Sequence, residues 1–233
     1  MCARGQSKGI PRKNIIEING IPLIAYSINL AKKILKSFNV HIGLSTDDLE
    51  IKKEAEKWGI STTYRRPIKL ANDTAGKIKT IKHLLEFEEQ RQSILYDFVL
   101  DLDISSPLRT KNDIESAFEQ MLLDQEALSL FSVNISNKNP YFNMVEKNEK
   151  GYYDLVKKLP ENFLSRQKSP KVYDINASFY WYRRLFFDKG FNTPITSKSL
   201  IYVMDHICFD LDNEEDLLYL NYLIKEKKIK KLL

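Results

Sequence analysis

The sequence predicts an α/β fold built on a mostly parallel sheet, and three observations support this prediction. Strand-like apolar runs alternate with amphipathic helical segments from the start of the chain to about residue 135. Such alternation is typical of right-handed βαβ units, whose strands run parallel. A basic loop with two glycines lies between the first strand and the first helix, and pairs of aspartates stand at the ends of two later strands. Ligands bind at these places in open α/β sheets.

Each element is predicted from a local pattern. Apolar residues at helical spacing predict a helix over 21–35, and the β-rich run "NVHIGLST" predicts a strand over 39–46. Either Asp47 or Asp48 can cap the following helix, which Gly59 ends. The same reasoning gives further strands and helices, at 60–66, 96–105 and 127–134 for the strands and at 74–90 and 110–124 for the helices.

The later part of the chain changes character. Thr110 stands three residues before Asp113 and predicts a capping-box-like start for the fourth helix. The alternation then gives way to a hairpin-like stretch followed by irregular chain rich in aromatic residues. We therefore predict a core formed by 1–138 and 173–233, with an insertion at 139–172 that lies against a partner subunit or over the site.

Composition and charge exclude several classes of protein. The 233 residues include 36 basic and 31 acidic side chains, a net charge of +5, which is too weak and too mixed for a nucleic-acid-binding surface. No apolar run reaches the roughly 20 residues that span a bilayer, and no secretory signal opens the sequence. Two cysteines give no disulfide framework, so we expect a cytoplasmic protein with no nucleic-acid or membrane partner.

The basic loop at 3–14, "ARGQSKGIPRKN", has the features of an anion site. It contains no carboxylate and four cationic side chains, Arg4, Lys8, Arg12 and Lys13. Gly5 and Gly9 let backbone N–H groups approach phosphate oxygens, although the loop lacks the GxxxxGK[ST] pattern of a Walker loop. The alternative is a solvated basic turn. Because only residues 1–3 precede the loop, we expect a very short first strand or a numbered chain that begins downstream of its natural start.

Two pairs of aspartates are candidate metal ligands. Alternate residues of a strand share a face, so we expect Asp101 and Asp103 in "DLDISSPLR" to point the same way. The same argument applies to Asp210 and Asp212 in "FDLDNEEDL". Carboxylate oxygens suit Mg²⁺, which bridges to phosphates and would stabilise a departing pyrophosphate. The alternative for Asp101 is that it only caps a turn.

The segment "LSRQKSPKVYDINASFYWY" carries polar side chains that suit a sugar acid. Arg166, followed by Gln167, can clamp a carboxylate with two parallel hydrogen bonds. Asn176 and Tyr180 offer polar contacts to a sugar. The alternative is an ordinary polar surface followed by a strand of the core.

These stretches occur together in one known family. The chain resembles the acylneuraminate cytidylyltransferases, the CMP-sialic acid synthetases, in the order and spacing of "ARGQSKGIPRKN", "RRPIKLANDTAG", "SSPLRTKNDI", "SRQ", "YDINASFYWY" and "FDLDNEEDL". The resemblance covers essentially the whole chain. The branch that acts on legionaminic acid and other bacterial nonulosonates looks closest, because of "CARG", "NPYFN" and "YDINAS".

The resemblance implies a Rossmann-like, GT-A-like nucleotidyltransferase core with a dimerisation insertion, and hence a homodimer. It also implies transfer of CMP from CTP, with Mg²⁺ or Mn²⁺, to the anomeric hydroxyl of a sugar acid such as legionaminic or N-acetylneuraminic acid. Pyrophosphate is released, and no protein nucleophile is required. The alternatives are the same reaction on Kdo or pseudaminic acid, and a nucleotide-binding paralogue that has lost catalysis.

The family's site positions map onto residues of this chain. The CTP-binding motif corresponds to Arg4, Ser7, Lys8, Lys13 and Asn14. The position that meets the cytosine ring is Arg66. The sugar-acid region corresponds to Arg166, Gln167, Asn176 and Tyr180, and the metal-binding pair to Asp210 and Asp212. The resemblance assigns the catalytic roles to Lys13, Arg4 and Asp212.

Two positions depart from the family pattern. Gln6 replaces the commoner glycine of the first motif. Asp103 stands where sialic acid enzymes usually carry glutamine. The related Kdo cytidylyltransferases use an aspartate there for Mg²⁺, so we expect Asp103 to contact the nucleotide and to bind the metal.

Overall fold

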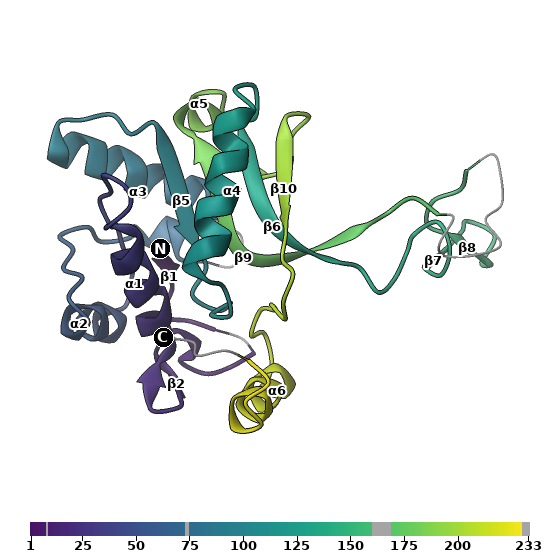
Figure 1. The fold of residues 1–233 in the computed structure, drawn as a ribbon, viewed down its shortest axis with the longest axis horizontal. Helices are drawn as coiled ribbons and strands as arrows, with labels where there is room; N and C mark the ends of the chain where they lie inside the picture. Colours follow the sequence, from purple (N-terminus) through teal and green to yellow (C-terminus); the bar gives the residue numbers. More distant parts are fainter. Residues whose placement is uncertain (8, 73–74, 160–168, 230–233) are drawn as a thin grey trace.

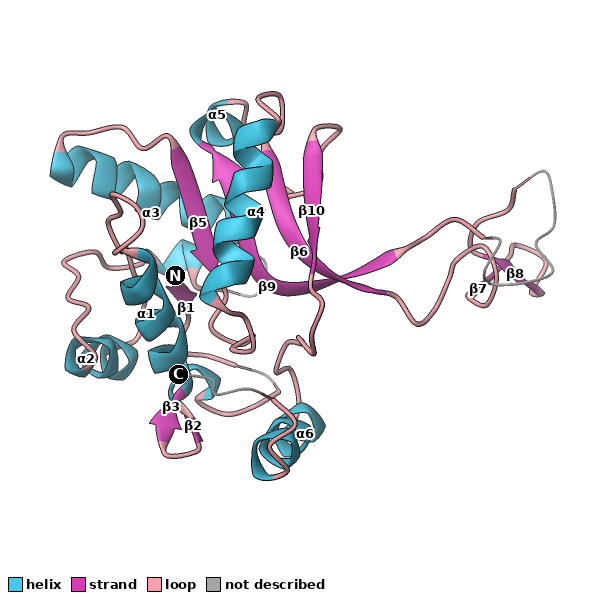
Figure 2. Cartoon of the chain, viewed as in Figure 1, coloured by secondary structure: helices cyan, strands magenta, loops and turns pink. Residues whose placement is uncertain are grey.

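A computed structural model of the chain describes residues 1–7, 9–72, 75–159 and 169–229. Its helices are α1 (Leu23–Ile34), α2 (Leu49–Lys57), α3 (Lys77–Gln92), α4 (Lys111–Leu123), α5 (Arg184–Asp188) and α6 (Glu214–Lys225), with short 3-10 turns at Lys13–Ile15 and Ile68–Leu70. Its strands are β1 (Cys2–Ala3), β2 (Glu17–Ile18), β3 (Ile21–Pro22), β4 (Ser45–Thr46), β5 (Phe98–Leu102), β6 (Ser129–Ile135), β7 (Val145–Lys147), β8 (Tyr153–Leu155), β9 (Tyr173–Arg183) and β10 (Ser199–Val203) (Figure 2). Among the described residues, no helix is both long and apolar enough to cross a membrane.

The central sheet has four strands in the order β10–β6–β9–β5 (Figure 1). β6 and β10 pair in parallel, whereas β9 runs antiparallel to both β6 and β5. It follows that β5, β6 and β10 share one direction and that β9 alone is reversed. β1 and β4 form a separate parallel pair of two residues each. This architecture confirms the predicted α/β class with a mostly parallel sheet.

The side chains of β9 show that the central sheet is buried on both faces. Phe179 and Trp181 lie in one apolar cluster with residues of α1 and α4. Tyr180 and Tyr182, which alternate with them, lie in a second cluster with residues of α3 and α5. Because alternate residues of a strand point to opposite faces, helices cover the sheet from both sides.

Two helix starts have the predicted caps. Asp48 accepts hydrogen bonds from the N–H groups of Glu50 and Ile51 at the start of α2. Thr110 and Asp113 form a reciprocal capping box at the start of α4. These bonds satisfy N–H groups that have no partner inside the helix, and they fix the loops that leave β4 and β5.

Two predicted strands differ from the structure. Of the strand expected at 39–46, only Ser45–Thr46 is formed, because its neighbour β1 is just two residues long and pairs with no more of it. The strand expected at 60–66 is absent, and this prediction was wrong. Among the described residues, its one backbone-to-backbone hydrogen bond with β4 runs from the N–H of Arg66 to the carbonyl of Thr46, 3.1 Å long. A single bond is too little to build a ladder.

The segment between β6 and β9 projects from the core (Figure 1). β6 and β9 remain paired out to Ile135 and Tyr173, and beyond them β7 and β8 form a small antiparallel hairpin. Its apolar side chains are strongly exposed, 72% for Tyr152 and 67% for Tyr153. The hairpin lies where the insertion is predicted, and the division of the chain into core and insertion stays a prediction.

Candidate nucleotide and metal site

The basic loop after β1 packs against the acidic segment that precedes α6. Nζ of Lys13 donates to the carbonyl of Leu211 at 2.6 Å and to Oδ1 of Asp212 at 3.2 Å. Gly9 lies so close that an added Cβ would stand 1.7 Å from the carbonyl oxygen of Asp212. Glycine is therefore needed here for the approach of two chain segments. The structure thus brings together two stretches that are far apart in sequence, since Lys13 and Asp212 are separated by 199 positions.

Carboxylates from outside the loop fix its other half. The N–H of Gly5 donates to Oδ1 of Asp47 at 3.1 Å. Arg12 adopts a left-handed backbone with φ of 56°, and its guanidinium pairs with Asp48 at 3.1 Å and with Glu50. The charge of Arg12 is thus neutralised by the start of α2, so this arginine supports the loop rather than a ligand.

Four more loop positions are predicted to contact the nucleotide. The side-chain amide of Asn14 donates to the carbonyl of Arg4 at 2.8 Å, which holds the two ends of the loop together. Arg4 and Ser7 are half-buried. Lys8, also predicted to contact the nucleotide, lies outside the described residues. The roles of these residues toward CTP stay predictions.

Lys77, the first residue of α3, joins the two aspartates at the carboxyl end of β5. Its Nζ lies 2.8 Å from Oδ2 of Asp101 and 2.5 Å from Oδ2 of Asp103. It also lies 5.1 Å from the ring centre of Tyr180 on β9. Asp101 and Asp103 therefore point the same way, as the strand period predicts, and Asp101 is held in an ion pair instead of capping a turn.

The protonation states in this cluster follow from burial and from the ion pairs. Burial alone would raise the pKa of Asp103, but the Lys77 ammonium and hydrogen bonds from Ser105 hold it well below its usual range. Burial opposes the charge on Lys77, yet the two carboxylates raise its pKa well above the usual value. Burial raises the pKa of Tyr180 to about 12. At neutral pH a charged lysine and a charged Asp103 therefore lie beside a neutral phenol.

Asp210 approaches this cluster through Ser105. The N–H and hydroxyl of Ser105 donate to Oδ1 of Asp103 at 3.0 and 2.8 Å, and its carbonyl accepts the N–H of Leu211 at 2.9 Å. Burial raises the pKa of Asp210, and the nearby charge of Asp103 raises it further. In the part of the chain that the structure describes, Oδ1 of Asp210 is buried without a hydrogen-bond partner.

The two carboxylates of Asp103 and Asp210 fit a hard divalent cation. A buried carboxylate oxygen without a partner is costly to keep ionised, and a cation between it and the second carboxylate would remove that cost. Oxygen donors of this kind are those that Mg²⁺ prefers. Among the predicted metal ligands, Asp210 has the environment that a metal ion would stabilise, and Asp103 supplies the neighbouring negative charge.

Asp212 has a different environment from Asp210. Its side chain is 71% exposed and pairs with Lys13, and its N–H donates to Asp216 in the first turn of α6. The residues from 209 to 212 form no strand, so the expected shared strand face for Asp210 and Asp212 was wrong. No neighbouring strand pairs with this segment, and it runs as a loop into α6.

Arg66 lies against β4. Its side chain is buried, and its Nε and Nη2 donate to the hydroxyl and carbonyl of Ser45 at 2.9 and 2.7 Å. This places the guanidinium beside the end of the β1–β4 pair, one strand away from the basic loop. Contact with a cytosine ring stays a prediction.

The sugar-side residues fall into two groups. Asn176 is buried on β9, where its amide donates to Asn134 at 2.7 Å and accepts from the hydroxyl of Ser132 at 2.6 Å. These bonds hold an irregularity of the β6–β9 ladder, next to Ala177 with its positive φ of 53°. Tyr180 lies three residues on, beside Lys77. Arg166 and Gln167 lie outside the described residues.

Sequence reasoning missed two residues of the site. Lys77 gave no sign of its role, because it lies 24 and 26 positions before the aspartates that it joins, and only the fold brings it to them. Arg109, in the quoted "SSPLR" stretch, is buried and donates to the carbonyls of Asp103, Ser106 and Ser178 at 2.7, 2.5 and 2.9 Å. It holds the turn that carries Asp103, and its place two residues after Pro107 in a loop that follows a strand was the available signal.

A family model described as cytidylyltransferase matches residues 1–229. The chain belongs to the cytidylyltransferase family. This match confirms the resemblance read from the sequence motifs.

Named relatives of this cytidylyltransferase extend over almost the whole chain. It is 40% identical to post-translational flagellin modification protein B of Campylobacter coli, over 98% of this chain and 95% of that protein. It is 37% identical, with the same coverage, to CMP-N,N'-diacetyllegionaminic acid synthase of Campylobacter jejuni. In structure it resembles CMP:2-keto-3-deoxy-manno-octonic acid synthetase complexed with CTP, with a TM-score of 0.66, 15% identity and 97% coverage of both chains. The structural likeness shows that the cytidylyltransferase has a nucleotidyltransferase fold.

Proposed function

We propose that this cytidylyltransferase is a CMP-nonulosonic acid synthetase. It transfers CMP from CTP to the anomeric hydroxyl of a sialic-acid-like sugar, legionaminic or N-acetylneuraminic acid, and releases pyrophosphate. The observation that carries the proposal is the similarity, over nearly the full length of both chains, to a CMP-N,N'-diacetyllegionaminic acid synthase. The contact of the basic loop with the acidic segment before α6 supports it.

The reaction requires positioning and charge neutralisation more than covalent chemistry. The anomeric oxygen of the sugar acid attacks the α-phosphorus of CTP, and the bond from this phosphorus to the bridging oxygen of the leaving pyrophosphate breaks. The hydroxyl proton passes to water. Most of the rate enhancement in such a transfer comes from orientation and from groups placed where charge develops. We assign phosphate binding to the basic loop, through Arg4, Ser7, Lys8, Lys13 and Asn14.

We assign the metal to Asp103 and Asp210, with Asp212 beside them. When bound, Mg²⁺ would screen the triphosphate and stabilise the pyrophosphate as it leaves. The orphaned oxygen of Asp210 and its raised pKa support this assignment. Lys77 keeps Asp103 ionised, and Arg109 holds the carbonyl of the same residue. Both act as positioning residues for the acidic site.

The base and the sugar acid would bind at opposite sides of this site. We assign the cytosine ring to Arg66, at the end of β4. We assign the sugar acid to Arg166, Gln167, Asn176 and Tyr180. The location of Tyr180 beside Lys77 supports the sugar side, because it places β9 next to the acidic cluster.

We also propose that the enzyme is a cytoplasmic homodimer. The exposed aromatic residues of the β7–β8 hairpin support a partner at this projection, since contiguous exposed apolar surface commonly marks an interface. Both cysteines are free thiols, which suits a reducing compartment. Light scattering of the purified protein tests the dimer, and Tyr152→Ser with Tyr153→Ser should shift it toward monomer.

The direct test of the function is pyrophosphate release from CTP with a panel of sugar acids. Legionaminic, N-acetylneuraminic, pseudaminic and Kdo acids should be compared, because Asp103 stands where Kdo enzymes also carry aspartate. We expect turnover with legionaminic or N-acetylneuraminic acid that requires Mg²⁺ or Mn²⁺ and is abolished by a chelator. Turnover with Kdo or pseudaminic acid alone would replace our substrate assignment and keep the reaction.

Calorimetry separates this proposal from a protein that binds nucleotide without catalysis. CTP binding with no turnover of any of the four acids would contradict the enzymatic proposal and leave a nucleotide-binding role. A protein that neither binds CTP nor turns over any of the four acids would contradict both the enzymatic proposal and the nucleotide-binding role.

A further inference from the structure

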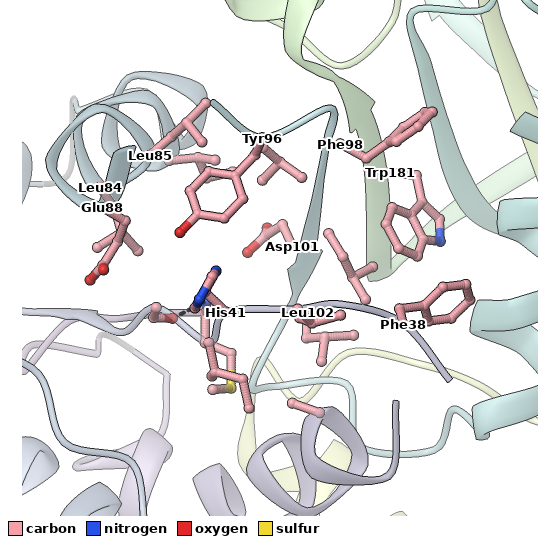
Figure 3. A pocket seen from close by; sticks show the side chains of 18 of the residues that line it. Phe38, His41, Leu84, Leu85, Glu88, Tyr96, Phe98, Asp101, Leu102 and Trp181 are labelled. Atoms are coloured by element: carbon pink, nitrogen blue, oxygen red, sulfur yellow. Dashed lines mark hydrogen bonds between the residues drawn. The ribbon is translucent and has the colours of Figure 1, made fainter. Parts of the chain in front are cut away.

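A cavity of about 450 Å³ lies along the free edge of β5. Residues 38–43 and 94–102 line it, together with side chains from α1 and α3 (Figure 3). Of the acidic cluster, Asp101 lines it, and none of the described residues of the basic loop does. This groove is therefore separate from the proposed CTP site.

Two stretches of backbone that could pair with a further strand line the groove. β5 is the last strand of its sheet and pairs with β9 alone. Residues 39–42 precede β4, and within the described residues they have no regular secondary structure and belong to no sheet. Sheet edges with free N–H and C=O groups are templates for a further strand.

The β1–β4 ladder leads directly into the groove. Cys2 is paired with Ser45 and Ala3 with Thr46. The ladder continues one step further back, because the N–H of Ser45 donates to the carbonyl of Met1 at 3.0 Å and the amino group of Met1 donates to the carbonyl of Gly43 at 2.9 Å. Met1 and Cys2 themselves line the groove. Residues added in the same register before Met1 would lie alongside 39–43.

Apolar side chains dominate both walls of the groove, although its lining also includes polar side chains such as His41, Glu88 and Tyr96. Ala31 and Ile34 of α1, with Phe118 and Trp181, line one side, and Ile81, Leu84 and Leu85 of α3 line the other. The two sets belong mainly to the two separate core clusters that cover opposite faces of the sheet. A strand that is covered on both faces is apolar at almost every position, as in parallel sheets.

We propose that this groove is a binding site for one more β-strand, an extended apolar peptide of about five residues that continues the β1 ladder. Its backbone pairs with residues 39–43 on one side and with β5 on the other, which joins the two sheets into one. Its side chains pack alternately on α1 and α3. An apolar strand fits better than a small polar ligand, because most side chains of the walls are aliphatic or aromatic and the free edge of β5 offers backbone N–H and C=O groups along its length.

The test adds such a strand to the full chain. One variant carries Val-Ala-Val-Ile-Val directly before Met1, and a control of equal length carries Gly-Ser-Gly-Ser-Gly. Relative to the control, we expect the thermal midpoint to rise by about 5 °C or more. We also expect backbone hydrogen exchange of residues 39–43 and 98–102 to slow by about tenfold or more, and binding of a hydrophobic dye to fall. A third variant with proline at the central added position should lose these effects, because proline cannot donate to the ladder.

Equal midpoints and equal exchange in the apolar, Gly-Ser and proline variants would overturn the proposal. So would a result in which the unextended chain is a dimer that the apolar extension converts to monomer, since a second copy would then occupy the groove. None of these measurements uses CTP or a sugar acid, so failure here leaves the proposed function standing.

Discussion

The carboxyl end of β5 and its free edge differ in how their polar groups are compensated. At its carboxyl end Lys77 compensates the charges of Asp101 and Asp103, whereas Oδ1 of the neighbouring Asp210 is buried without a partner among the described residues. Along its free edge β5 pairs with no strand of the described chain, and the neighbouring surface is mainly apolar.

The difference teaches where each region obtains its stability. The acidic end is held by side chains that come from α3 and from the loop after β5, so its order depends on charge and pH. The free edge depends on apolar packing, which is insensitive to charge. Changes at the acidic end should therefore affect turnover and pH dependence, whereas changes at the edge should affect stability alone.

The largest effect is expected from Asp210→Asn. This change removes a carboxylate that we assign to the metal, so turnover should fall by about a hundredfold or more. The folded state raises the pKa of Asp210, which means that the charged form is destabilising above that pKa. Stability at pH 7 should consequently stay equal or rise.

Turnover and thermal unfolding of this variant should be measured beside Glu214→Gln, an exposed carboxylate at the start of α6. Loss of turnover together with loss of stability in Asp210→Asn would mean that Asp210 has a structural role. It would contradict the distinction between an acidic end that governs turnover and an edge that governs stability.

Gly9→Ala should separate the basic loop from the acidic segment. The added Cβ meets the carbonyl oxygen of Asp212 at 1.7 Å, so the two backbones must move apart. We expect a loss of about 1–3 kcal/mol in the free energy of unfolding and weaker CTP binding. Gly76→Ala is the matched control, because no atom lies within 4 Å of its added Cβ. Equal CTP affinity in both variants would show that the contact between the loop and Asp212 has no part in binding.

Lys77→Met should make stability depend on pH in a new way. In the natural chain the depressed pKa of Asp103 stabilises the fold above the ordinary carboxyl pKa of about 4, and this contribution is lost as pH falls through the folded value. Without the ammonium, two buried carboxylates repel each other at neutral pH.

We expect Lys77→Met to cost about 1–3 kcal/mol at pH 7, less than a fully buried pair because the lysine is 37% exposed. The cost should shrink toward pH 4, because Asp103 without the ammonium is no longer held ionised and takes up a proton more readily. Urea unfolding at both pH values measures it, with the exposed Lys79→Met as control. A cost that is the same at pH 4 and pH 7 would contradict the ion-pair account.

The smallest effect is expected along the groove. Ile42 lines the groove and is only partly buried, so Ile42→Ala should cost less than about 1 kcal/mol of unfolding free energy. Ile28 is fully buried in the core and is not a lining residue of the groove, and Ile28→Ala should cost about 2–5 kcal/mol. Similar losses for both would show that the groove is already filled and packed.

The sequence predicts local features of the site better than its assembly. The period of a strand was enough to place Asp101 and Asp103 on one face, and the spacing of Thr110 and Asp113 was enough to predict a cap. Lys77 could not be found in this way, because its role depends on where α3 begins relative to β5.

The failures have a common physical cause. The segments 60–66 and 209–212 have residues that suit strands, but no neighbouring strand pairs with them. Gly9 was expected to make room for phosphate, whereas it makes room for the backbone of Asp212. Strand pairing and close approach of distant segments are tertiary properties, and a local pattern does not specify them.

The central claim is that Asp103 and Asp210 hold a metal ion against a triphosphate bound by the basic loop. Anomalous scattering from a crystal grown with Mn²⁺ and CTP tests it most directly. We predict one manganese peak within direct coordination distance, about 2 Å, of a carboxylate oxygen of both residues, with phosphate oxygens on the same ion and Lys13 in contact with the triphosphate. A nucleotide bound elsewhere, or manganese that contacts neither carboxylate, would contradict the account.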